Sequence, residues 1–203
     1  MQTVLYLVRH ADSAYTPGRE RERGLSDQGF EDVHRVQELL RNEEMDAFYS
    51  SPYRRAVQTV NEAALAAGKQ LVLVEDLRER SLAEEHFCVK GEHFQDMKKR
   101  LYDNFDDAYP GGESSAEAQR RGVQAILGIL DRHAGHQVVV GTHGDIMTLI
   151  LNHFDRSYGY DFWRSTSMPD IYKLEFEAQQ LKRVTRCWDS GKPYDLNTEV
   201  LSG

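Results

Sequence analysis

The sequence predicts an α/β fold, in which a mostly parallel central sheet has helices on both faces in a three-layer α/β/α arrangement. Two features of the chain lead to this prediction. Short apolar runs recur along it, and most are followed by a longer segment with apolar residues at helical spacing. Strands buried on both faces have such uninterrupted apolar sequences, and a repeated order of strand then helix is typical of parallel sheets.

The size and charge of the chain limit the classes of protein to which it can belong. Its 203 residues suit one domain, and its formal net charge of −8 argues against a nucleic acid or an anionic membrane as its partner. Cys88 and Cys187 lie far apart and match no metal-ligand spacing. Because the sequence shows neither a disulfide framework nor a secretory signal, we expect a cytoplasmic protein.

The first expected strand, Val4–Val8, leads directly into Arg9 and His10. Open α/β sheets bind ligands at the carboxyl ends of their strands, so this pair would lie where chemistry takes place. The loop that follows, residues 11–24, is rich in arginine and glutamate. It is either a solvated loop or a lid whose arginines face an anionic ligand. Ser26 is then a favourable N-cap for a helix.

The second expected strand, Ala47–Tyr49, is followed by Ser50-Ser-Pro52, a set of helix-start signals. Arg54 and Arg55 would lie in the first turn of the helix that begins there. Basic residues in a first turn oppose the helix dipole, unless an anion shares the site. This local conflict therefore marks the turn as a candidate anion site.

The rest of the chain supplies two more parallel strands and a terminal hairpin. Leu71–Val74 is the third expected strand, and a charged loop with Glu79 follows it. Helical spacing recurs between residues 91 and 109, and Ser114-Ser-Ala-Glu117 is a capping box that opens another helix. The fourth expected strand, Gln137–Val140, leads to His143 and a helix over residues 146–154. Residues 171–176 and 179–188 are expected to pair as a hairpin.

Three of these strand ends carry groups that suit a phosphate ligand. Arg9 and His10 follow the first strand, Arg55 follows the second, and His143 follows the fourth. Because parallel strands end at the same edge of a sheet, we expect these side chains to meet in one pocket. Two histidines and two arginines would match a dianionic phosphoryl group. Gly144 would let the backbone approach the ligand, and the next helix would add N–H donors.

These motifs resemble those of the histidine phosphatases, the phosphoglycerate-mutase-like superfamily. Arg9-His10-Ala11 resembles the family's Arg-His-Gly signature, and Ser50-Ser-Pro-Tyr-Arg-Arg55-Ala-Val-Gln-Thr59 resembles its Ser-Pro-Leu-x-Arg-Ala-x-Gln-Thr block. Val139-Val-Gly-Thr-His143-Gly is similar to its second histidine block. Leu25-Ser-Asp-Gln-Gly29 and Gly111-Gly-Glu-Ser114 are weaker matches to two further blocks. All five occur in the family's order and cover most of the chain up to about residue 154.

The resemblance implies a role for each matching residue. His10 would be the nucleophile that becomes phosphohistidine, and Arg9 and Arg55 would hold the phosphoryl oxygens. His143 would hydrogen-bond the phosphoryl group and stabilise its charge. Glu79 would protonate the leaving oxygen and then deprotonate the water that hydrolyses the phosphohistidine. The resemblance implies neither a metal nor another cofactor.

Departures from the family's motifs leave alternatives open. Ala11 replaces the usual glycine, and the loop near Ala83 lacks a glycine that often follows the acid. Glu84 and Glu85 are therefore alternative acids. Arg54 is either a solvent-facing neighbour of Arg55 or a contact for the substrate.

The resemblance also implies a single histidine-phosphatase-like domain over residues 1–203, with an inserted helical and loop segment at about 81–112 over the site. Mutases of the family usually carry a longer insertion, so we favour a phosphomonoesterase that hydrolyses a small organic phosphate. The alternatives are a phosphoglycerate-mutase-type phosphotransferase and a low-turnover regulatory module that binds a phosphorylated ligand. Four aromatic residues are expected to line the substrate pocket: Tyr15, Tyr53, Phe87 and Phe94.

Overall fold

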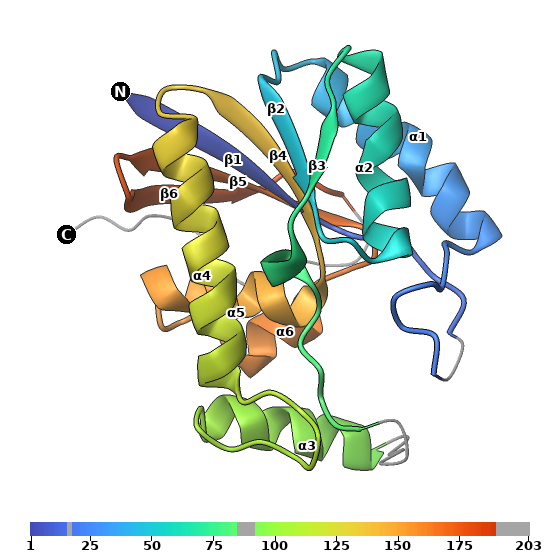
Figure 1. The fold of residues 1–203 in the computed structure, drawn as a ribbon, viewed down its shortest axis with the longest axis vertical. Helices are drawn as coiled ribbons and strands as arrows, with labels where there is room; N and C mark the ends of the chain where they lie inside the picture. The colour runs from blue at the N-terminus through green and yellow to red at the C-terminus, as the bar shows by residue number, and fades with distance from the viewer. Residues whose placement is uncertain (16–17, 85–91, 190–203) are drawn as a thin grey trace.

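The computed structural model describes residues 1–15, 18–84 and 92–189, which form a six-stranded sheet with helices on both faces (Figure 1). The strands are β1 (Gln2–Arg9), β2 (Ala47–Ser50), β3 (Leu71–Leu73), β4 (Gln137–Thr142), β5 (Asp170–Glu177) and β6 (Gln180–Arg186). The helices are α1 (Asp27–Arg41), α2 (Arg54–Ala66), α3 (Glu92–Asp103), α4 (Ser115–Arg132), α5 (Gly144–Phe154) and α6 (Tyr160–Ser165), and a 3₁₀ turn covers Glu75–Leu77.

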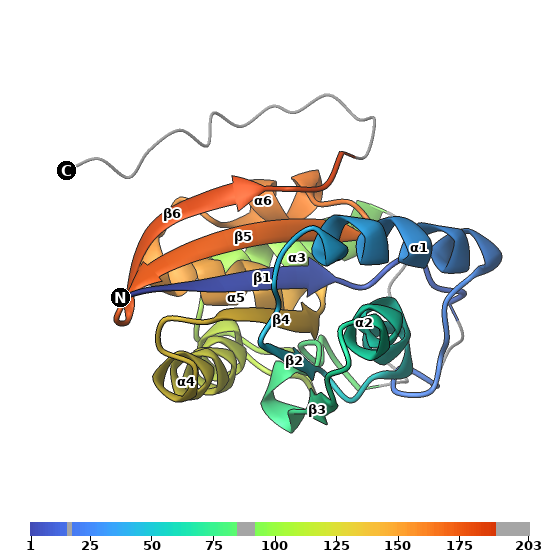
Figure 2. The same ribbon diagram turned by 90° about the horizontal axis from the view of Figure 1, so that it is seen from above.

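The strand order places three of the expected site segments side by side. The sheet has the order β3-β2-β4-β1-β5-β6, which Figure 2 shows from β6 at the top to β3 at the bottom. The first four strands in this order are parallel, whereas β5 is antiparallel to β1 and β6 is antiparallel to β5. The predicted three-layer α/β fold is therefore confirmed. Because β2, β4 and β1 are adjacent and parallel, their carboxyl ends lie at one edge.

Alternate residues of β1 build the two halves of the core. Leu5 and Leu7 pack in a cluster with residues of α4 and α5, while Tyr6 and Val8 pack in a cluster with residues of α1 and α2. Strand side chains alternate between the two faces of a sheet, so a run that is apolar throughout requires a helical layer on each side. Figure 1 shows these two helix pairs beside opposite faces of the sheet.

Several expected element boundaries agree with the structure, and others differ. Ser26 is the N-cap of α1, and Ser114 forms the expected capping box of α4. The second helix begins at Arg54 with Tyr53 as its N-cap, so Pro52 lies outside it. Helix α3 is shorter than its expected range because it ends at Asp103, and α6 is not expected from the sequence.

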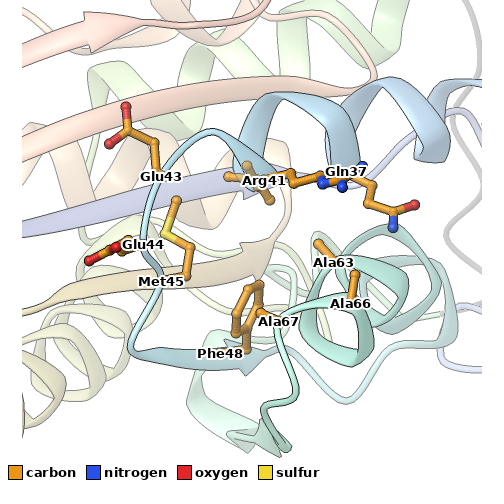
Figure 3. Close-up of a pocket in the computed structure, with 10 residues that line it drawn as sticks. Gln37, Arg41, Glu43, Glu44, Met45, Phe48, Ala63, Ala66 and Ala67 are labelled. Carbon is orange, nitrogen blue, oxygen red and sulfur yellow. The ribbon is translucent and has the colours of Figure 1, made fainter.

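A pocket of about 480 Å³ opens at the end of the sheet away from these carboxyl ends (Figure 3). It lies between the last turns of α1 and α2 and the loop that enters β2. Its lining residues are Gln37, Leu40, Arg41, Glu43, Glu44, Met45, Phe48, Ala63, Ala66 and Ala67. None of the candidate site residues is among them. No helix within the described ranges combines the length and apolar character that crossing a membrane requires.

Candidate active site

The parallel pairing of β1 with β4 brings the two candidate histidines together. Arg9 lies opposite Thr142 in this pairing, so the residues that follow, His10 and His143, are neighbours. Their ring centroids are 5.2 Å apart, and their planes are inclined by 65°. His10 is 4% exposed and His143 is fully buried, so both rings lie in an environment of low dielectric.

The hydrogen bonding of His10 decides which ring nitrogen can react. Nδ1 of His10 lies 2.7 Å from the carbonyl oxygen of Ala11. A carbonyl oxygen only accepts, so Nδ1 carries the hydrogen and the lone pair of the neutral ring is on Nε2. Burial, followed by the charges of His143 and Arg55, lowers the pKa of His10 well below its ordinary value. The ring is therefore neutral near pH 7, and Nε2 can act as a nucleophile.

His143 is fixed by the end of the neighbouring strand. The hydroxyl oxygen of Ser51, which follows β2, lies 2.7 Å from Nε2 of His143, and the Tyr53 ring packs edge-on against it at 5.1 Å. Burial, followed by the charges of Arg55 and Arg23, lowers the pKa of His143 well below its ordinary value. Its buried Nδ1 has no hydrogen-bond partner among the described residues.

Arg9 lies between Thr166 and Gly144. One of its terminal nitrogens donates to the hydroxyl and, at 3.2 Å, to the carbonyl oxygen of Thr166. A β-carbon at Gly144 would stand 2.9 Å from the central carbon of the Arg9 guanidinium, so glycine leaves room for this side chain. Burial lowers the pKa of Arg9. Its Nε is buried and has no partner in the described part of the chain.

Helix α2 presents Arg55 to the interior and Arg54 to solvent. Arg55 is 1% exposed and donates to the carbonyl oxygen of Glu20 at 2.5 Å. Its other terminal nitrogen pairs with the Glu20 carboxylate at 3.2 Å, and Arg23 pairs with the same carboxylate at 3.3 Å. Burial, followed by repulsion from Arg23, lowers the pKa of Arg55 to about 10, so it stays charged at pH 7. The arginine-rich loop thus reaches the site through Arg23 and Glu20.

Glu79 is held at the N-terminus of α5. Its carboxylate accepts hydrogen bonds from the backbone N–H groups of Asp145 at 3.2 Å, Ile146 at 3.0 Å and Arg80 at 3.0 Å. The sequence predicts that N–H donors of this helix serve the ligand, whereas in the structure two of them bind the Glu79 carboxylate. They bind the candidate acid because a helix N-terminus attracts any carboxylate that can reach it.

Burial acts to raise the pKa of Glu79, but nearby positive groups outweigh it. These are Lys98, the N–H of Ile146 and Arg55, and together they hold the pKa of this carboxyl below its ordinary value. Glu79 is therefore ionised at neutral pH, in the form that accepts a proton.

A protein-family model described as "Histidine phosphatase superfamily (branch 1)" matches residues 5–189 of the chain. The chain belongs to this superfamily. A similar protein by sequence is phosphoglycerate mutase-like protein 4 of Arabidopsis thaliana, 32% identical over 155 residues that cover 70% of this chain and 67% of the relative. Another is putative phosphoserine phosphatase 2 of Hydrogenobacter thermophilus, 30% identical over 159 residues that cover 72% and 76%.

Solved structures share the fold of this histidine phosphatase superfamily member. Native mycobacterial glucosyl-3-phosphoglycerate phosphatase has a TM-score of 0.71 at 17% identity, and the match covers 92% of this chain and 98% of that one. A phosphoserine phosphatase mutant from Entamoeba histolytica, in complex with phosphoserine, has a TM-score of 0.66 at 19% identity and covers 92% and 95%. At these identities the likeness concerns the fold alone.

In this superfamily member, Arg121 of α4 holds the loop that carries Glu79 through hydrogen bonds to its backbone. It donates to the carbonyl oxygens of Asp76 at 2.7 Å, Arg78 at 2.8 Å and Glu79 at 3.3 Å, and it pairs with Glu113 at 2.8 Å. Arg121 is not among the residues expected from the sequence. Its partner Glu113 lies in the weak Gly111–Ser114 match, which was the available signal.

Most of the other candidates from the sequence lie outside the group formed by Arg9, His10, Arg55 and His143, which we call the cationic cradle. Tyr53 is an expected pocket residue that does contact it, through the ring of His143 and the guanidinium of Arg55. Glu84 is exposed, and Glu85 and Phe87 lie outside the described residues. Tyr15 is 61% exposed, whereas Phe94 is partly buried beside Trp163, with ring centroids 6.4 Å apart. Among the described residues, no cluster of three or more His, Cys, Asp or Glu side chains is placed to hold a metal ion.

A buried ion pair near the cradle of this superfamily member was also missed. Lys98 of α3 contacts Asp145 of α5, and both are almost fully buried. The available signal was the position of Lys98 among apolar residues, since it lies at helical spacing from Phe94 and Leu101. A lysine on the inward face of a helix rarely stays there without a partner.

Proposed function

We propose that this protein is a metal-independent phosphomonoesterase that hydrolyses small organic phosphates through a phosphohistidine at His10. One observation carries the proposal: three buried side-chain nitrogens of the cationic cradle have no hydrogen-bond partner among the described residues. They are Nε of Arg9, Nε of Arg55 and Nδ1 of His143. A buried unpartnered donor costs about 1–3 kcal/mol, and phosphoryl oxygens would accept from all three.

In the first step, Nε2 of His10 attacks phosphorus. The P–N bond forms as the ester P–O bond breaks, and Glu79 gives a proton to the leaving alcohol oxygen. Arg9 and Arg55 stabilise the charge on the equatorial oxygens. If the Ser51 hydroxyl donates to Nε2 of His143, then Nδ1 of that ring carries a hydrogen and donates to the same group.

In the second step, Glu79 accepts a proton from water, and the water oxygen attacks phosphorus as the P–N bond breaks. The ionised form of Glu79 that the structure favours suits this step. The first step requires its protonated form. A bound phosphate dianion opposes the cations around Glu79, so substrate raises the pKa of this carboxyl towards the value that an acid needs.

A mutase-type phosphotransferase is the second candidate, because relatives named as phosphoglycerate mutases or mutase-like proteins are among the sequence matches. The short insertion favours hydrolysis: of the regular elements in the described residues, only α3 lies between Glu79 and Gly111. A mutase must keep water from the phosphohistidine while the bound substrate reorients, and a longer insertion over the site would do this.

The test is turnover of p-nitrophenyl phosphate and of a panel of alkyl phosphates with a chelator present, for the wild type and His10→Ala. The proposal expects hydrolysis by the wild type and none by the variant. Conversion of 3-phosphoglycerate to 2-phosphoglycerate would favour the mutase. No turnover by folded wild-type protein across the panel would favour a binding module. Activity that chelation abolishes and zinc or magnesium restores would contradict metal independence.

A further inference from the structure

A cluster of charged and polar side chains is buried between the inserted helix α3 and the start of α5. The Asp145 carboxylate, which is fully buried, accepts from the Tyr102 hydroxyl at 2.9 Å and lies 3.3 Å from a terminal nitrogen of Arg80. Its second oxygen contacts the Lys98 ammonium. Lys98 is 6% exposed, and the proposed chemistry gives neither it nor Asp145 a part.

This cluster is joined directly to the candidate acid. The backbone N–H of Asp145 donates to one oxygen of Glu79, and the N–H of Ile146 donates to the other. The residue that Lys98 contacts is therefore also a residue that holds the Glu79 carboxylate. Since α3 lies within the expected insertion and α5 within the core fold, Lys98 joins the two at the site.

The surroundings of Lys98 strengthen its electrostatic effect. Its ammonium lies 5.0 Å from the centroid of the Trp163 ring and 5.5 Å from that of Phe94. These rings exclude water and attract a cation through their π faces. In such a medium a charge acts on its neighbours more strongly than it does in water.

We propose that Lys98 is a positioning residue for Glu79: through Asp145 it fixes the N-terminal turn of α5 that holds this carboxylate, and its charge favours the ionised form that accepts a proton from water. The proposal rests on the proposed phosphatase function. It gives the inserted helix a part in the second step of the reaction, the hydrolysis of the phosphohistidine.

The charged and titratable groups that act on Glu79 come from every element around it. They are Arg9 from β1, Tyr53 and Arg55 from the start of α2, Arg80 from its own loop, Lys98 and Tyr102 from α3, Arg121 from α4, and Asp145 from α5. Among the charges, Lys98 contributes most to lowering the pKa of Glu79. Burial and then Arg80 lower the pKa of Lys98 itself well below its ordinary value, whereas Glu79 opposes that change. The direct contact with the Asp145 carboxylate favours the charged ammonium.

The test compares Lys98→Met with Lys98→Arg and with Lys99→Met, a matched control one residue along α3 whose side chain is 55% exposed. The measurement is kcat for p-nitrophenyl phosphate as a function of pH. This leaving group needs little protonation, so the acidic limb reports Glu79 as a base. In Lys98→Met the limb should move to higher pH by about 1–3 pH units, the effect of removing one close opposite charge, with little change in KM. Lys98→Arg and Lys99→Met should keep the wild-type limb.

A uniform loss of kcat with an unmoved acidic limb would show a merely structural role and would overturn the proposal. A second readout needs no activity: the carbon-13 shift of the Glu79 carboxyl, assigned with Glu79→Gln, followed against pH. A higher titration midpoint in Lys98→Met than in the wild type supports the link, and equal midpoints refute it. This holds even if the wild type hydrolyses no phosphate, in which case the proposed function fails separately. If Lys98→Met does not fold, Lys98→Gln takes its place with the same expectations.

Discussion

The guanidinium of Arg9 packs against Gly144, where an added β-carbon would stand 2.9–3.1 Å from three of its atoms. Gly144 is the first residue of α5 and follows His143 directly. The positions of His143 and Arg9 are thus coupled through Gly144, which has no side chain. This explains in physical terms why glycine follows the histidine here, and it can be tested by adding a single methyl group.

Gly144→Ala should lower kcat/KM by about tenfold or more, because an arginine displaced by about 1 Å no longer meets the phosphoryl oxygens correctly. Steady-state kinetics and thermal unfolding measure the two effects separately. Gly128→Ala on α4 is the matched control, since a β-carbon there meets nothing within 4 Å. It should leave activity unchanged and stabilise the helix by up to about 1 kcal/mol. Full activity in Gly144→Ala would mean that Arg9 does not need its present position.

A phosphoenzyme at His10 is the second expectation. Brief incubation with a phosphorus-32-labelled phosphomonoester in the presence of a chelator should label the protein, and the label should be stable to base and lost in acid. His10→Ala should remain unlabelled. His34→Ala, at a histidine whose side chain is 73% exposed on α1, should be labelled like the wild type. Label that survives acid or persists in His10→Ala would place the covalent step elsewhere.

The edge of the sheet could be predicted from the sequence because each signal there is local. Apolar runs specify the parallel strands, and polar residues directly after them must lie at a common edge once strand order makes those strands neighbours. The choice of Arg55 over Arg54 rests on the resemblance of residues 50–59 to the family's block, which is also a local signal. The structure agrees, with Arg55 buried and Arg54 exposed.

The groups that set the environment of Glu79 could not be predicted in the same way. Arg121 and Lys98 come from α4 and α3, and their contacts depend on how distant segments pack. Periodicity assigns a residue to a helix face but not to a partner on another element. The spacing of Lys98 from Phe94 and Leu101 is compatible with an inward face, but it does not indicate that Asp145 lies opposite.

Glu79→Gln should slow hydrolysis of an alkyl phosphate by about 10²–10⁴-fold, because an alkoxide leaves slowly without a proton donor. The loss should be smaller for p-nitrophenyl phosphate, whose leaving group is stable as an anion. Glu84→Gln is the control for the rival acid, and it should behave as the wild type with both substrates. If Glu84→Gln is the slower variant, the acid role belongs to the loop after residue 80.

Stability should fall as the pH is lowered from about 7.5 to about 5.5. Burial, the largest cause for both rings, lowers the pKa values of His10 and His143 in the folded state, whereas in the unfolded chain they return to about 6.5. Above that pH both states are neutral and the rings contribute nothing to the slope. Below it the unfolded chain binds protons that the folded chain does not, so each ring lowers the free energy of unfolding by up to about 1.4 kcal/mol per pH unit.

Urea unfolding at a series of pH values measures this slope. Replacing His10 with asparagine should reduce this slope by up to the contribution of one proton. His133, whose pKa burial also lowers, adds a contribution of the same sign that remains in the His10 variant. The carboxyl groups with lowered pKa values, Glu79 among them, act below about pH 4.5 and do not interfere in this window. If the free energy of unfolding stays constant or rises as the pH is lowered from 7.5 to 5.5, the two rings accept protons in the folded state. That result would contradict a neutral His10 as the nucleophile.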